Sequence, residues 1–274
     1  MSKTKKVRMF VLLGVIFVHA VKLAAAQDEL YHFRSGVHLS SERPLSTKEA
    51  ETLVTGIRMW TGLDHIVFEP NGNLRLNDSA NVTGGSRAAR ELIIAAAASG
   101  DSFTLERHDN SPNIAFAQIE STDCYIDSSG QRHNVWRLRI DFEDFTKLSG
   151  NNKALAAFDV TASVVHELTH GVYGCLDLID DRDQLGGCER FVNQMRSELG
   201  LPLRLFYYPQ NIKAVNPDGS GFVRSELRFN FERAEKDKEL FVSFNAEKIF
   251  DFSRAKSKTA IRSELLAQKR MRVF

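Results

Sequence analysis

The chain has 274 residues, of which 43% are apolar and 26% are charged, and its formal net charge is +1. These proportions are those of a globular protein with enough chain for one large domain or two small ones. The near-neutral charge gives no indication of a basic surface, so we expect no nucleic-acid partner.

The first 26 residues are predicted to be a secretory signal peptide. A basic head, Lys3–Arg8, precedes the apolar run Met9–Val21, and Leu23–Ala26 offers small residues at the positions that a signal peptidase reads. The run is short for a membrane span, although an uncleaved anchor is the alternative. The segment holds five Lys/Arg and no Asp or Glu, so cleavage would change the net charge from +1 to −4. We expect a secreted or periplasmic protein without stable membrane insertion.

Helices and strands alternate along the first half of the remaining chain. A capping box at Ser46–Glu49 and the pair Gly85-Ser86 each precede a helical pattern, and Pro70–Asn73 is a turn signal between two short strands. The predicted elements are a strand at Leu30–Phe33, a helix after Ser46 with Leu53, Ile57 and Trp60 on one face, strands at Asp64–Glu69 and Leu74–Leu76, and a helix at Arg87–Ser99.

The second half begins with strands and ends with a hairpin. Alternating or β-rich composition predicts the strands, and glycines delimit the helices. The predicted elements are strands at Phe103–Glu106, Ile114–Ile119 and Val135–Phe142, a helix through Thr161–Gly174, a helix from about Cys188 to Leu199, a hairpin of Phe222–Phe231 with Leu240–Phe244, and a weak amphipathic helix at Ser253–Lys269. This order indicates an α+β fold in one domain, residues 27–274.

A metal-binding pattern lies in the middle of the chain, at His166-Glu167-Leu168-Thr169-His170. Residues four apart lie on one face of a helix, so both imidazoles can reach one ion. Glu167 can then accept a proton from a water that the ion activates. The alternative is a core helix with two satisfied histidines, but two buried imidazoles and a carboxylate are costly without partners. We therefore expect a zinc site.

Two residues downstream are candidates for the third ligand that a catalytic zinc requires. Glu189 lies 19 residues after His170, near the start of the next helix, and Asp177 lies seven residues after it. Glu189 is the preferred candidate, and Asp177 remains open. Asn193, one helical turn after Glu189, could hold a ligand or orient a histidine.

The HExxH pattern followed by Glu189-x-x-x-Asn193 resembles the gluzincin arrangement of the zincin metallopeptidases. The string from Glu189 to Arg204 is also similar to a segment of bacterial effector-type zinc metallopeptidases, and the likeness covers about residues 155–205. The resemblance implies a zincin-like fold, with a mixed or antiparallel sheet packed on the HExxH helix and on a ligand-bearing helix. It also implies that a strand near Val135–Phe142 lies above the metal helix and can pair with an extended substrate.

The expected function is hydrolysis of peptide bonds in a protein or peptide substrate. His166, His170 and Glu189 would hold Zn²⁺, with Glu167 as the general base. A donor must also stabilise the oxyanion, and the sequence does not rank the candidates Tyr173, Tyr207, Tyr208 and Arg204.

Two other functions are compatible with the same residues. An exported binding or structural protein could use a closed zinc site, with Asp177 or Cys175 as the fourth ligand, only to stabilise its fold. A toxin or effector delivered to another cell would keep the protease chemistry and change the substrate.

Three cysteines remain after residue 26, which indicates one disulfide and one free thiol in an oxidising compartment. Cys175 and Cys188 flank the segment that follows the HExxH helix, so we expect this pair to be bonded. The bond would close a short loop beside the site.

Overall fold

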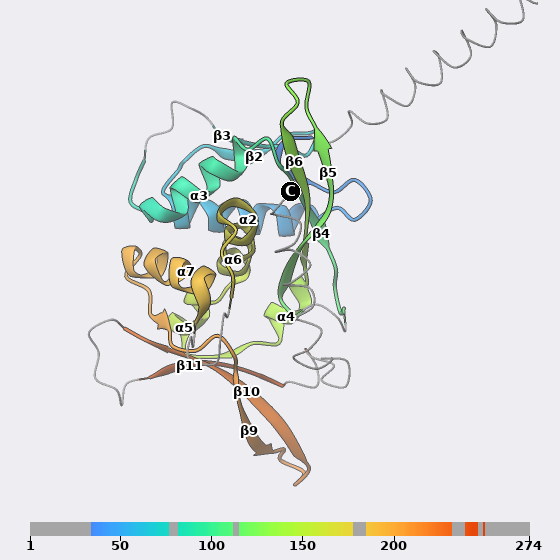
Figure 1. Ribbon diagram of the computed structural model, residues 1–274. Coiled ribbons are helices and arrows are strands. Elements are labelled where there is room, and N and C mark those ends of the chain that lie inside the picture. Colours follow the sequence, from blue (N-terminus) through green and yellow to red (C-terminus); the bar gives the residue numbers. More distant parts are fainter. Residues whose placement is uncertain are drawn as a thin grey trace, which may run out of the picture.

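One helix, α6 (Val160–Tyr173), carries the HExxH residues and lies at the centre of the molecule (Figure 1). The computed structural model describes residues 34–76, 82–111, 115–177, 185–231, 239–245 and 249. The predicted signal peptide, the strand at Leu30–Phe33 and the helix at Ser253–Lys269 lie outside this part of the chain. Within it, no helix is long and apolar enough to cross a membrane.

A four-stranded sheet stands beside the helices, to the right in Figure 1. Its order is β1-β4-β6-β5; the first three strands are parallel and β5 runs antiparallel to β6. This arrangement leaves β5 at an edge, beside α6. The strands are β1 (Gly36–Leu39), β4 (Ser102–Arg107), β5 (Ala117–Ile126) and β6 (Arg132–Ile140).

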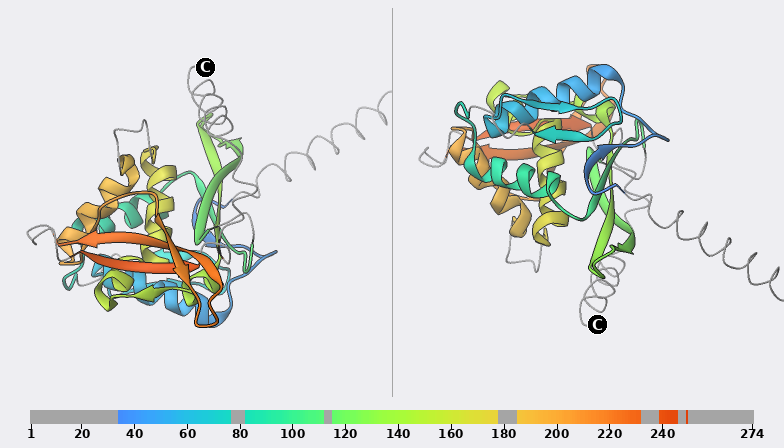
Figure 2. Two further views of the ribbon diagram at one scale, coloured as in Figure 1. Left: turned by 90° about the horizontal axis from the view of Figure 1, so that it is seen from below. Right: turned by 90° about the horizontal axis from the view of Figure 1, so that it is seen from above.

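A second sheet lies beneath the helices, as the view from below shows (Figure 2). Its order is β7-β11-β10-β8, and β9 also pairs with β10. Its strands are β7 (Ser149–Gly150), β8 (Leu203–Arg204), β9 (Gln210–Val215), β10 (Gly221–Asn230) and β11 (Leu240–Asn245). The predicted hairpin is confirmed: β10 and β11 pair antiparallel, with Leu227 opposite Val242.

The remaining elements surround α6. They are the helices α2 (Thr47–Thr61), α3 (Arg87–Ala97), α4 (Phe142–Thr146), α5 (Asn152–Ala157) and α7 (Gly186–Glu198), and a small hairpin of β2 (Ile66–Phe68) with β3 (Leu74–Leu76). Helices α2, α3 and α7 all contact α6. The expected α+β class is confirmed.

Two clusters of buried apolar side chains stabilise these layers. The larger one joins the four-stranded sheet to α2, α3, α6 and α7, and the smaller one joins α5 to the second sheet. Phe145 and Leu201 pack against both clusters. These two side chains thus connect the packing of the two sheets.

Two glycines let α6 approach its neighbours closely. A Cβ on Gly171 would lie 2.5 Å from Cε1 of Phe103 in β4, and a Cβ on Gly56 of α2 would lie 1.8 Å from Oγ1 of Thr161. Both distances are below any real Cβ contact, so a larger residue would push α6 away from its packing partners.

Two sequence-based expectations about strands need correction. The strand near Val135–Phe142, expected to pair with substrate, is β6, and both of its edges are already paired with β4 and β5. Among the described strands, the edge of this sheet that lies next to α6 belongs to β5. This strand begins at Ala117 and continues to Ile126, well past the predicted end at Ile119. The sequence pattern missed its outer half because that half is largely exposed and shows no apolar alternation.

We expect Gly56→Val to lower the free energy of unfolding by about 1–3 kcal/mol, because the valine must push against Thr161. Glu51→Val introduces the same residue at an exposed position of α2 and controls for helix propensity. Urea denaturation measures both variants. Equal losses in the two would show that α2 and α6 are not in close contact at Gly56.

Candidate functional site

The local sequence of α6 fixes where the HExxH side chains point. Asp159 caps the helix by accepting a hydrogen bond from the Ala162 amide at 2.7 Å, and Gly174 ends it in the left-handed conformation, with φ of 62°. All residues from Val160 to His166 are buried, so packing on every side holds this half of the helix in place. His166, Glu167 and His170 consequently line a cavity of about 600 Å³.

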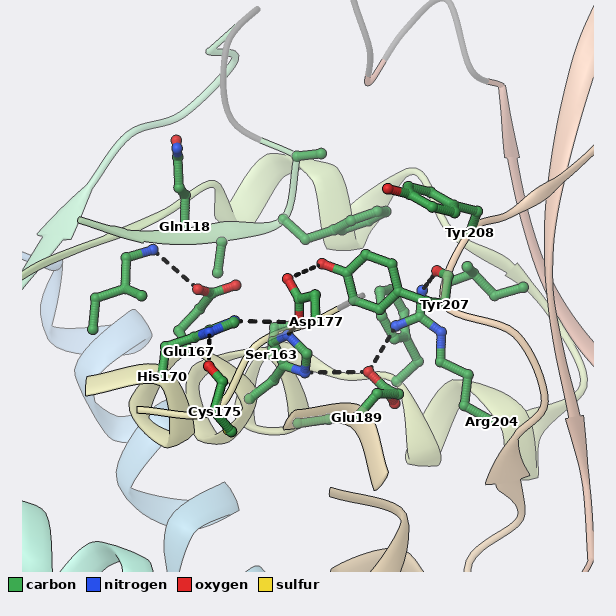
Figure 3. Close-up of a pocket in the computed structure, with 18 of the residues that line it drawn as sticks. Gln118, Ser163, Glu167, His170, Cys175, Asp177, Glu189, Arg204, Tyr207 and Tyr208 are labelled. Atoms are coloured by element: carbon green, nitrogen blue, oxygen red, sulfur yellow. Dashed lines mark hydrogen bonds and ion pairs between the residues drawn. The ribbon is translucent and has the colours of Figure 1, made fainter. Parts of the chain in front are cut away.

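Asp177 completes a group of three possible metal ligands with the two histidines (Figure 3). Its Oδ1 lies 2.9 Å from Nε2 of His166 and 3.3 Å from Nε2 of His170. Ligand atoms about 2.1 Å from a tetrahedral ion are separated by about 3.4 Å, close to these spacings. Oδ1 is also buried, and its contacts with the two rings are ion-pair contacts that lack hydrogen-bond geometry, which suits an atom that is placed to bind a cation.

The far ring nitrogens of both histidines are also engaged. Nδ1 of His170 lies 3.0 Å from the carbonyl oxygen of Cys175, and Nδ1 of His166 lies 3.2 Å from Oε2 of Glu189. A histidine that donates from Nδ1 presents the lone pair of Nε2 to a metal. His170 is therefore oriented for binding through Nε2, on the side of Asp177, whereas Nδ1 of His166 faces Glu189 in an ion-pair contact without a hydrogen bond.

Glu189, the preferred third ligand from sequence, lies on the opposite side of His166 from Asp177. Its side chain is 1% exposed, and both carboxylate oxygens are occupied: Oε1 lies 2.5 Å from Nη1 of Arg196, and Oε2 lies 3.1 Å from Nη1 of Arg204. Burial alone would raise the pKa of Glu189, but the two guanidinium groups hold it well below its ordinary value. Glu189 thus lies on the Nδ1 side of His166, and Asp177 lies where a third metal ligand could bind.

Within the described residues, the hydrogen bonds of Asn193 go to neither histidine and to neither candidate third ligand. Its amide joins α7 to β8 instead: Nδ2 donates to the Arg204 carbonyl at 2.8 Å, and Oδ1 accepts from the Arg204 amide and from Arg196. Sequence reasoning assigned no role to Arg196, which is 1% exposed and lies two helical turns after Glu189. The seven-residue spacing of Glu189 and Arg196, which places both on one helix face, could have predicted their ion pair.

Glu167 faces the cavity from beneath the edge strand. Its Oε2 accepts a hydrogen bond from the Ile119 amide of β5 at 3.0 Å. Burial raises the pKa of Glu167, against the opposing effect of the nearby His166 and His170. A carboxylate with a raised pKa beside a cation site is well placed to take up a proton.

The four candidates for an oxyanion donor occupy different surroundings. The hydroxyl of Tyr207 donates to Oδ2 of Asp177 at 2.5 Å, and its ring lies 5.9 Å from that of His166. Tyr173 is 46% exposed and packs against Phe191, whereas Tyr208 lines the rim of the cavity and is 61% exposed. The guanidinium of Arg204 is committed to Glu189 and to the carbonyls of Phe206 and Tyr207. Only Tyr207 has its polar group at the candidate metal position.

A disulfide between Cys175 and Cys188 is present, as expected from the sequence, with the two Cα atoms 5.4 Å apart. Cys124 is the free cysteine. The bond excludes Cys175 as a metal ligand, because its sulfur is no longer a thiolate.

Comparison with known proteins does not assign this arrangement to a family. No protein-family model, no curated protein and no solved structure matches the chain. The geometry and chemistry of the residues around His166 and His170 therefore carry the functional interpretation.

We expect Asp177→Ala to weaken zinc binding by more than about 100-fold, because it removes one of three donors. Glu189→Gln should weaken binding less, and should lower the free energy of unfolding by about 3–5 kcal/mol because Arg196 and Arg204 lose a buried partner. Competition with a chromogenic chelator and urea denaturation of the metal-free protein measure the two effects. The reverse ranking of zinc affinities would return Glu189 to the ligand position.

Proposed function

We propose that the protein is a zinc-dependent peptidase whose metal ligands are His166, His170 and Asp177. The observation that carries this proposal is the convergence of three ligand atoms within 4.8 Å of one another, on the wall of a cavity that also contains Glu167. Two imidazoles and one carboxylate are a donor set that suits zinc and leaves a coordination position for water or substrate.

Glu167 is the general base of this proposal. A zinc ion held by His166, His170 and Asp177 would act as a Lewis acid and would lower the pKa of a water molecule toward neutrality. Glu167 takes the proton of that water and later delivers it to the amine that leaves from the cleaved peptide bond. The position of its carboxylate next to the two histidines, with a raised pKa, supports this role.

Tyr207 is the donor that stabilises the oxyanion. Burial, together with Asp177, raises the pKa of Tyr207 well above its ordinary value, so its hydroxyl keeps its proton. In the structure it donates its one proton to Asp177, and in the proposed transition state that proton would turn to the oxygen that develops negative charge at the metal position.

An extended peptide is the proposed substrate. Ala117, Gln118, Ile119 and Glu120 of β5 line the cavity, and β5 is paired on one side only among the described strands. A peptide in extended conformation can add to such an edge through main-chain hydrogen bonds. The hydrogen bond from the Ile119 amide to Glu167 shows that this edge of β5 lies next to the proposed general base.

A zincin-like fold and an exported protein complete the proposal. The HExxH helix beneath an edge strand supports the fold, and the resemblance of residues 155–205 to zincin metallopeptidases points the same way. The predicted signal peptide and the disulfide support export to a secreted or periplasmic location.

A closed structural zinc site is less compatible with the geometry. Such a site needs four protein ligands, whereas the described residues offer only His166, His170 and Asp177 in a group. The remaining side of this group faces the cavity, where water and substrate have access.

We expect Glu167→Gln to keep zinc bound while peptide hydrolysis falls by about 10²–10⁴-fold, because only the proton acceptor is lost. A library of quenched fluorescent peptides measures hydrolysis, and metal analysis measures the zinc content. Glu91→Gln, on the exposed face of α3, is the control and should behave like the wild type. Unchanged hydrolysis in Glu167→Gln would contradict the mechanism.

We expect Tyr207→Phe to lower kcat by about 10²–10³-fold with a small change in KM, because an oxyanion donor acts in the transition state. Zinc affinity should change little. Tyr173→Phe removes a hydroxyl outside the cavity and serves as the control. A loss of zinc affinity with unchanged kcat at saturating zinc would mean that Tyr207 only orients Asp177.

A further inference from the structure

Asp177 differs from the two histidines because it is not part of a helix. It follows Gly174, where α6 ends, by three residues. A side chain on a free segment would lose conformational entropy on binding an ion, and that loss would weaken the site. The position of Asp177 therefore depends on what holds its backbone.

Three contacts fasten this segment to the first turn of α7. The carbonyl oxygen of Leu176 accepts hydrogen bonds from the amides of Gly187 at 2.6 Å and Cys188 at 3.3 Å. The disulfide joins Cys175 to Cys188, so a covalent bond and two hydrogen bonds act on adjacent residues. The backbone immediately before Asp177 is thus held by the first turn of α7, in which Cys188 and Glu189 are buried.

Gly186 makes the closest contact with Asp177 itself. A Cβ on Gly186 would lie 0.9 Å from the carbonyl oxygen of Asp177 and 1.8 Å from its carbonyl carbon. Both of these atoms are backbone, so a rotamer change cannot remove the overlap. Gly186 also has φ of 73°, in the left-handed region that favours glycine. Only a glycine lets the two backbones pack at this distance.

The same segment also orients one of the histidines. The carbonyl oxygen of Cys175 lies 3.0 Å from Nδ1 of His170, and Sγ of Cys188 lies 3.3 Å from the same nitrogen. A shift of residues 175–177 would disturb two of the three donors at once.

We propose that Gly186 and the Cys175–Cys188 disulfide position the metal site, because they hold Asp177 where it completes the ligand set of His166 and His170. This inference rests on the proposed zinc site and adds to it a reason why the third ligand is in place before the ion binds. Gly186 acts by permitting close contact, and the disulfide acts by keeping residues 175–177 against α7.

The first test compares Gly186→Ala with Gly130→Ala. Gly130 has a similar left-handed conformation, with φ of 86°, but a Cβ there would meet nothing within 4 Å. Both variants bear the cost of alanine at positive φ, and only Gly186→Ala collides with Asp177. We expect Gly186→Ala to raise the zinc dissociation constant by about 10–100-fold, and Gly130→Ala to leave it unchanged. The constants come from competition with a chromogenic chelator, on protein shown to be folded by circular dichroism.

The second test removes the disulfide without leaving thiols that could bind zinc. We expect the double variant Cys175→Ala/Cys188→Ala to lose zinc affinity to a similar extent, and Cys124→Ala, which removes only the free cysteine, to bind zinc as the wild type does. This pair keeps the proposal testable if Gly186→Ala does not fold. Asp177→Ala gives the affinity of a site without its third ligand.

The outcomes separate the two proposals. Wild-type zinc affinity in folded Gly186→Ala and in the double variant would refute the positioning role and leave the zinc site standing. A wild-type protein that binds no zinc would refute the site itself. Loss of affinity in both variants, with the two controls unchanged, would support the positioning role.

Discussion

The ion pairs of Glu189 with Arg196 and Arg204 are the interaction on which the site depends. All three side chains are buried, and they join α7 to β8 beneath α6. Buried ion pairs contribute little net stability, because the Coulomb attraction must offset desolvation, but they are strongly destabilising when one partner is removed. Here the ion pairs fix a position: the two guanidinium groups hold the Glu189 carboxylate in one place, next to the His166 ring.

The site combines residues from the larger apolar cluster with residues next to the second sheet. Helix α6 and strand β5 belong to the larger apolar cluster, whereas Tyr207 follows β8, a strand of the second sheet. Arg204 connects the two, since it contacts Glu189 on α7 and the carbonyls of Phe206 and Tyr207. Burial around the start of α6 also affects its cap: it raises the pKa of Asp159 to about 6, although the amides of Ala162 and Thr161 and the charge of Arg196 oppose this. The charge of Arg196 therefore acts both on Glu189 and on the carboxyl group that caps α6.

Part of this site could be predicted from sequence because it depends on local spacing. The i, i+4 relation of His166 and His170 is fixed by helical geometry alone, and the short separation of Cys175 and Cys188 favoured their pairing. The choice between Glu189 and Asp177 depends on which carboxylate the two arginines neutralise. That contact joins residues on α7 and β8, and no spacing rule encodes it. The edge position of β5 could not be predicted either, because the order of strands depends on the pairing of the whole sheet.

The closeness of the three candidate ligands along the chain has a consequence for the order of folding. His166, His170 and Asp177 fall within twelve consecutive residues, so closing this segment around an ion costs little chain entropy. By contrast, β1 pairs with β4 across more than sixty residues, and β7 pairs with β11 across about ninety. In the proposed zinc site, the ligand segment can therefore come together early, but the site would be complete only after α7 packs against residues 175–177 and holds Asp177 in place.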